Sequence, residues 1–78
     1  MRSYKQIQKE LYLEYSELMI KLNNLKWFIS TSADFLGFDE KIKESMKKQR
    51  DAMEEYKFQL MDRASMLRDA EINNMVPR

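Results

Sequence analysis

Apolar residues recur at steps of three and four along two long segments of the chain, and this spacing favours helices. Because an α-helix turns once every 3.6 residues, residues at such steps fall on one side of it. The first stripe is Tyr4, Ile7, Leu11, Tyr15, Leu18, Leu22, Leu25 and Ile29. The second, whose steps alternate as in a coiled-coil seam, is Ile42, Met46, Gln49, Met53, Tyr56, Leu60, Arg63 and Leu67.

Residues that interrupt helices are almost absent, with one Gly and one Pro in 78 positions. The glycine lies between the stripes, in a segment rich in capping residues. We expect Ser30 or Thr31 to end the first helix or cap a short turn, Gly37 to be left-handed, and Asp39 to cap the second helix. The prediction is an all-α hairpin, one domain over residues 1–78, with helices over about 3–30 and 39–73 and a loop over about 31–38.

Folding this hairpin about Asp34 predicts how the two stripes face each other. The expected layers are Ile29 with Ile42, Leu25 with Met46, Leu22 with Gln49, Leu18 with Met53, Tyr15 with Tyr56, Leu11 with Leu60, and Ile7 near Arg63. Gln49 and Arg63 would then be polar residues in an apolar seam, which costs stability unless they find partners. They either fix register and oligomeric state, with Arg63 reaching Glu10 or Glu14, or line a ligand pocket with Tyr56.

Each predicted helix also carries apolar residues away from its main stripe. They are Leu13, Ile20 and Trp27 at seven-residue steps, with Tyr12 and Met19 beside them, and Phe58 and Met61 on the second helix. A two-helix hairpin has no further element to cover them. A chain this small, without disulfides, also gains from continuing its core into another subunit. We therefore predict a homo-oligomeric helical bundle, a dimer or larger, with Leu13, Ile20, Trp27, Phe58 and Met61 at the interface.

Composition excludes many chemistries, because the chain has no Cys and no His. Disulfides, thiolate zinc sites and the commonest general base are all missing. A single glycine rules out a Gly-rich phosphate loop, and carboxylate pairs such as Glu54 and Glu55 are typical of solvated helix faces. We predict a protein that is not an enzyme, has no catalytic residue and needs no metal or cofactor.

The charge balance and hydropathy bear on partners and location. Fourteen Lys and Arg against thirteen Asp and Glu give a net charge of +1, so no global field attracts nucleic acid or an anionic membrane. No apolar stretch approaches the length of a membrane span, and the chain opens on a polar amphipathic pattern. We predict a cytoplasmic protein that has no membrane partner and binds nucleic acid weakly at most.

Cationic and aromatic residues nevertheless converge at the loop end of the hairpin. The densest cluster is Lys41, Lys43, Lys47, Lys48 and Arg50, and the first helix ends nearby with Lys26, Trp27 and Phe28. The cluster is either a charged outer face with helical Glu/Lys pairs or a patch that recognises an anion. In the second case Gln reads a base edge, Tyr stacks and Arg binds phosphate. The candidate ligand residues are Lys26, Trp27, Gln49, Arg50, Tyr56 and Arg63.

Residues about 10 to 67 also resemble a known family of small proteins. The residues that carry the resemblance are Lys21-Leu22-x-x-Leu25-x-x-Phe28-Ile29, a loop with Phe35 and Leu36, and Gln49-x-x-Ala52-Met53-x-x-Tyr56-x-x-x-Leu60-x-x-Arg63. They resemble the small helical-hairpin proteins of tailed bacteriophages and prophages, which have no assigned chemistry. The resemblance implies a phage accessory protein acting in the host cytoplasm against host defence.

Three hypotheses follow for the activity. The first is sequestration of a cyclic-nucleotide immune signal between subunits of the oligomer. The second is a stoichiometric, anti-CRISPR-like inhibitor that binds a host defence protein through Trp27, Ile20, Phe58 and Met61. The third is a structural or regulatory coiled coil with no small ligand.

Overall fold

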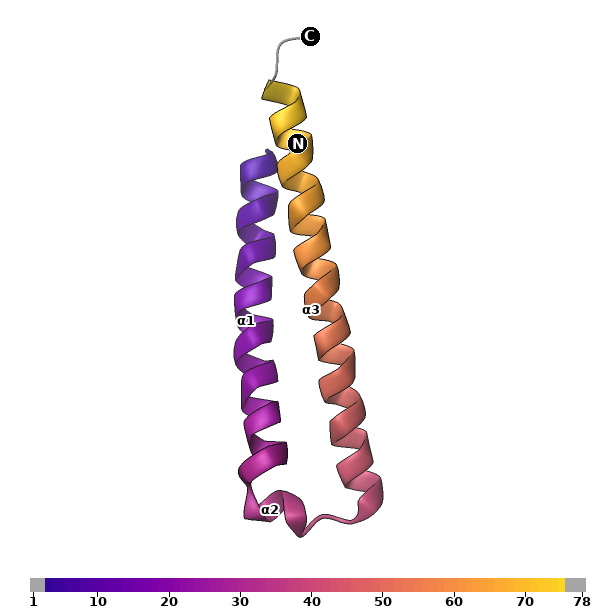
Figure 1. Ribbon diagram of the computed structural model, residues 1–78. Helices are drawn as coiled ribbons and strands as arrows, with labels where there is room; N and C mark the ends of the chain where they lie inside the picture. Colours follow the sequence, from indigo (N-terminus) through magenta and orange to yellow (C-terminus); the bar gives the residue numbers. More distant parts are fainter. Residues whose placement is uncertain (1–2, 76–78) are drawn as a thin grey trace.

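A computed structural model describes residues 3–75 of the chain, and these residues form three helices. Helix α1 spans Tyr4–Thr31, α2 spans Ala33–Leu36 and α3 spans Glu40–Met75. No strand occurs in this part of the chain, which confirms the all-α class. The predicted outer bounds of the domain, residues 1 and 78, lie outside the described residues. Figure 1 shows α1 and α3 side by side in opposite directions, with α2 across one end.

Short polar contacts define where α1 begins and ends. The Ser3 hydroxyl accepts a hydrogen bond from the Gln6 amide (3.2 Å), and the Gln6 side chain accepts one from the Ser3 amide (3.1 Å). This reciprocal capping box satisfies two amides at the first turn. At the other end, the hydroxyls of Ser30 and Thr31 donate to carbonyls of the preceding turn. Both residues therefore remain inside α1, and Ser32 is its C-cap.

Two predictions for the connection between the long helices hold, since α1 ends at Thr31 and Asp39 caps α3, whereas the alternative cap of the short turn and the left-handed Gly37 are wrong. The Asp39 carboxylate caps α3, since its Oδ1 accepts a hydrogen bond from the Ile42 amide (3.0 Å), as predicted. The cap of α2 is Ser32, whose hydroxyl accepts from the Asp34 amide, rather than Ser30 or Thr31. Gly37 has φ −82° and ψ −10°, so it is right-handed. Its amide donates to the Asp34 carbonyl in a tight last turn, which needs no left-handed residue.

The core follows the predicted stripe of α1. Leu11, Leu18 and Leu22 are buried, and Leu60 of α3 is only 1% exposed. Leu11, Leu18 and Leu60 form one cluster against which Tyr15, Met53 and Leu67 pack. Leucines thus hold the helix pair together from the N-terminal part of α1 to its middle.

Half of the predicted α3 seam is wrong. Met46, Met53, Leu60 and Leu67 are buried or half-buried, but Ile42, Gln49, Tyr56 and Arg63 are exposed. The residues that follow Ile42, Gln49 and Tyr56, which are Lys43, Arg50 and Lys57, are less exposed and flank the seam instead. Long charged side chains can do this because their methylene stems cover apolar surface while their heads reach polar partners. Gln49 and Arg63 are therefore not buried polar residues in the seam.

The relative position of the helices along their axes follows the prediction only in part. Leu11 and Leu60 share one cluster, and Tyr56 reaches Glu14 next to Tyr15, as the predicted layers require, but other contacts lie further along α3. The side-chain amide of Gln8 donates to the Glu71 carboxylate (3.0 Å), whereas Arg63 was expected near Ile7. Lys26 likewise pairs with Glu54 of α3, further along than expected. The physical reason is α2, because this extra turn moves the centre of the connection beyond Asp34 and displaces α3 relative to α1.

Three phenylalanines fill the end of the molecule next to α2. The Phe28 ring meets the Phe35 ring edge to face, at 6.3 Å between centroids, and the Phe38 ring at 6.1 Å. Phe35 is buried, and the Lys43 ammonium lies 5.9 Å from its ring centroid. Figure 1 shows α1 and α3 further apart here than near the N-terminus of α1. We call Phe28, Phe35 and Phe38 the phenylalanine cluster.

Candidate functional site

The structure leaves one group of predicted ligand residues exposed along α3. Gln49, Tyr56 and Arg63, which we call the polar stripe, follow each other at seven-residue spacing, or two turns of helix. Their exposure follows from the position of the α3 seam, which runs through the neighbouring residues instead. The stripe is thus accessible to a ligand or to another subunit.

Tyr56 is the member of the polar stripe that contacts α1. Its hydroxyl donates a hydrogen bond to the Glu14 carboxylate. This bond, together with desolvation and the negative charge of Glu14, raises the pKa of Tyr56, while the Arg63 guanidinium acts in the opposite direction. This region of the structure therefore combines the carboxylate of Glu14, a hydrogen-bond acceptor, with the aromatic ring of Tyr56 and the cation of Arg63.

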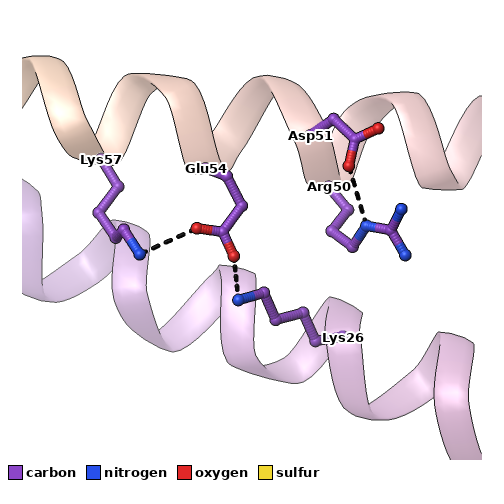
Figure 2. A network of polar contacts seen from close by, with 5 residues as sticks. All are labelled: Lys26, Arg50, Asp51, Glu54 and Lys57. Carbon is purple, nitrogen blue, oxygen red and sulfur yellow. Dashed lines mark hydrogen bonds and ion pairs between the residues drawn. The ribbon is translucent and has the colours of Figure 1, made fainter.

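Lys26, a second predicted ligand residue, belongs to an ion-pair network between the helices. Figure 2 shows its ammonium reaching from α1 to the Glu54 carboxylate of α3. Lys57 approaches the other oxygen of the same carboxylate, with 2.9 Å between Nζ and Oε2. The two lysines hold the pKa of Glu54 below its ordinary value. An anionic ligand that uses Lys26 must therefore compete with Glu54.

Arg50 and Trp27 complete the predicted set and lie on different helices. Arg50 Nε is 3.1 Å from an oxygen of its neighbour Asp51, as Figure 2 also shows. Trp27 is 66% exposed and follows Lys26 on α1. Of the ion pairs drawn in Figure 2, that of Lys26 with Glu54 joins the two long helices.

The five predicted interface residues are all exposed in the single chain. Leu13, Ile20 and Trp27 lie on α1, and Phe58 and Met61 lie on α3. Phe58 is 53% exposed, although the Lys57 ammonium lies 4.6 Å from its ring centroid. No described element of the chain covers these side chains.

A groove that the sequence did not indicate lies between the first half of α1 and the second half of α3. Its cavity volume is about 650 Å³, and it is lined by Gln8, Leu11, Tyr12, Tyr15, Leu60, Met61, Asp62, Ala64, Ser65 and Arg68. Of the predicted site residues only Met61 is among them. The available signal was the step of four from Gln8 to Tyr12, which marks a face of α1 beside its stripe. We call this cavity the tyrosine groove.

Within residues 3–75, no group of three or more acidic, His or Cys side chains is arranged to hold a metal ion. No helix in the same range is both long and apolar enough to cross a membrane.

Fold and site together define a small all-α protein that presents polar and aromatic side chains on long helices. The sequence matches the family described as Sequestin over residues 1–66, so the chain belongs to this family. The family name is consistent with a protein that binds and sequesters, and it favours a binding role over a catalytic one. Comparison with curated proteins finds no match to the chain, and comparison with solved structures finds none either.

Proposed function

We propose that this protein sequesters a cyclic-nucleotide immune signal without transforming it, and that it acts for a bacteriophage in the host cytoplasm against host defence. The ligand is held at subunit interfaces of a homo-oligomer built through Leu13, Ile20, Trp27, Phe58 and Met61. Membership of the Sequestin family supports sequestration as the mode of action. The phage setting rests on the resemblance to small helical proteins of tailed phages.

The observation that carries the proposal is the exposure of Tyr56 and Arg63 on one face of α3, two turns apart. A guanidinium binds a phosphate through two parallel N–H donors, which suits the phosphodiester of a cyclic nucleotide. The Tyr56 ring offers a stacking surface, and the Gln49 amide two turns away can pair with a base edge. The spacing of the stripe lets one ligand contact several members.

Lys26, Trp27 and Arg50 serve as additional ligand residues. Lys26 lies beside the only tryptophan, so a base stacked on Trp27 has a cation within reach for its phosphate. Binding exchanges the Lys26 contact with Glu54 for a contact with the phosphate, and Lys57 remains with Glu54. This exchange lowers the cost of using Lys26, because Glu54 keeps one cationic partner.

Titration with a panel of cyclic dinucleotides and trinucleotides tests the proposal, with thermal shift first and calorimetry on any hit. Arg63→Ala should raise the dissociation constant about 10- to 100-fold, the usual range for a lost charged hydrogen bond. Tyr56→Ala, which removes the stacking ring, should cost about 5- to 100-fold. Arg68→Ala is the matched control, since this exposed arginine of α3 lines the tyrosine groove instead. A panel that shifts nothing, or equal losses in both arginine variants, contradicts the proposal.

A second candidate function is stoichiometric inhibition of a host defence protein, as an anti-CRISPR protein does. The exposure of Trp27, Ile20, Phe58 and Met61 favours it, since large exposed apolar side chains are available to a partner protein. Pull-down from host lysate with the native protein and with Phe58→Asp distinguishes the two functions. If neither nucleotide nor host protein binds, the remaining function is that of a structural or regulatory coiled coil.

A further inference from the structure

The outer side of α1 carries three exposed apolar residues at equal spacing. Leu13, Ile20 and Trp27 are 53%, 63% and 66% exposed and follow each other at seven-residue steps. We call them the outer stripe. An apolar stripe on a helix needs a partner, and steps of seven residues are those of one position in a coiled coil.

The outer stripe is suited to pairing with itself. In an antiparallel pair with its two-fold axis at Ile20, each Ile20 faces the other, and each Leu13 faces the Trp27 of the second copy. The smaller side chain then lies opposite the larger one in both outer layers. Such an isologous contact closes after two subunits, because the same surface serves both.

Two charged residues beside the outer stripe favour the same orientation. Glu17 and Lys21 are exposed and flank Ile20 on one side of the helix, three residues before it and one after it. A two-fold axis at Ile20 places Glu17 of each copy near Lys21 of the other, so opposite charges meet on both sides of the axis. A parallel pair in register would instead place Glu17 and Lys21 of the two copies on opposite sides of the interface, so that these charges would not meet and the attraction would be lost.

We propose that a second copy of this chain covers the outer stripe, in an antiparallel α1–α1 pair centred on Ile20. This pairing brings Trp27 of the second copy beside Tyr12, at the edge of the tyrosine groove, so that each groove gains an aromatic wall from the other subunit. The inference rests on the homo-oligomeric part of the proposed function and is independent of the nucleotide.

Cysteine cross-linking tests the geometry directly, because the chain has no cysteine of its own. Ile20→Cys should form a disulfide with itself on mild oxidation, since residues at a two-fold axis lie close together. Leu13→Cys mixed with Trp27→Cys should form the mixed disulfide in preference to either homodimer. Met66→Cys, at an exposed position on α3, should cross-link far more slowly. Equal cross-linking of all four variants, or none at Ile20→Cys, overturns the proposal.

A charge exchange tests the orientation separately. By sedimentation, Glu17→Lys and Lys21→Glu should each weaken dimerisation about 3- to 10-fold, because each creates two like-charge contacts. The double variant Glu17→Lys with Lys21→Glu should restore most of the loss, since opposite charges meet again. A double variant that is no tighter than the single variants excludes this pairing. Far-UV circular dichroism of each variant checks that the helices are retained.

Trp27, the only tryptophan, reports the same contact by fluorescence. Its emission should shift to the blue on dimerisation and stay red-shifted in Ile20→Asp at equal concentration. All measurements use protein freed of bound nucleotide. If Ile20→Cys cross-links but no nucleotide shifts the melting temperature, this inference stands and the proposed ligand is refuted. If a nucleotide gives a shift that depends on Arg63 but Ile20→Cys does not cross-link, the proposed ligand stands and this inference is refuted.

Discussion

The two ends of the helix pair are held together in different ways. Near the N-terminus of α1, leucines from both long helices form one cluster, and the helices approach closely enough for Gln8 to reach Glu71. Next to α2 the helices stand further apart, and the phenylalanine cluster fills the space. Aliphatic side chains thus close the narrow end, and aromatic rings the wide one.

This difference shows what a short connection does to a helix pair. The extra turn of α2 sets the wide spacing at its end, and a leucine could not bridge it. A phenylalanine supplies more volume from one backbone position, and edge-to-face rings add about 0.5–1.5 kcal/mol beyond burial. The wide end therefore depends on a few large side chains, while the narrow end shares its contacts among many.

The largest expected effect is at the wide end. Phe35→Ala should lower the free energy of unfolding by about 3–5 kcal/mol, because it removes a buried ring and leaves a cavity between α1 and α3. Urea unfolding followed by circular dichroism measures it. Leu36→Ala is the matched control and should change stability by less than about 0.5 kcal/mol, since Leu36 is exposed. Equal effects of the two variants would show that the rings do not hold this end.

The narrow end should lose somewhat less. Leu60→Ala is expected to cost about 2–4 kcal/mol, because Leu60 packs between Leu11 and Leu18 and the other leucines can close part of the cavity. The same urea experiment applies, with Met66→Ala as the exposed control on α3. A larger loss for Leu60→Ala than for Phe35→Ala would reverse the comparison between the two ends.

A smaller effect is expected where the connection enters α3. Asp39→Ala should cost about 1 kcal/mol, because the Ile42 amide loses its acceptor at the first turn. Asp39→Asn keeps an acceptor oxygen and should retain most of the stability. If both variants lose the same amount, the charge of Asp39 rather than its cap stabilises the connection.

The sequence predicts the buried side of α1 well and that of α3 only in part. Leu11, Leu18 and Leu22 are buried where the spacing places them, because no other side of α1 carries as many apolar residues. On α3, apolar and polar residues share the predicted seam, and lysines one position along can cover apolar surface equally well. Periodicity alone cannot decide between these two rotations of α3 about its axis.

The candidate site is less predictable for the same reason. The sequence singles out Tyr56 and Arg63 as unexpected residues in a seam, yet they lie exposed beside it. The contact of Tyr56 with Glu14 lies next to the predicted layer of Tyr15 and Tyr56, but its partner could not be named from spacing alone. The tyrosine groove depends on the relative position of the helices, since its walls come from both long helices. The displacement of α3 arises from α2, whose effect on register no spacing rule conveys.

The smallest expected effect concerns the ion pair between the two ends. The hydrogen bonds of Lys26 and Lys57 hold the pKa of Glu54 below its ordinary value of 4.5. A lowered pKa in the folded protein means that the contribution of this ion pair to stability is present above about pH 4.5 and is lost as the pH falls through the lowered value.

Between about pH 7 and pH 2, the melting temperature of Glu54→Gln should therefore fall less steeply than that of the native protein. Glu55→Gln, at an exposed neighbour, should follow the native curve. The difference should be small and shrink in high salt, because the network is partly exposed and screened. Parallel curves for Glu54→Gln and the native protein would show that the two ends, and not the contact between them, set the acid stability of the chain.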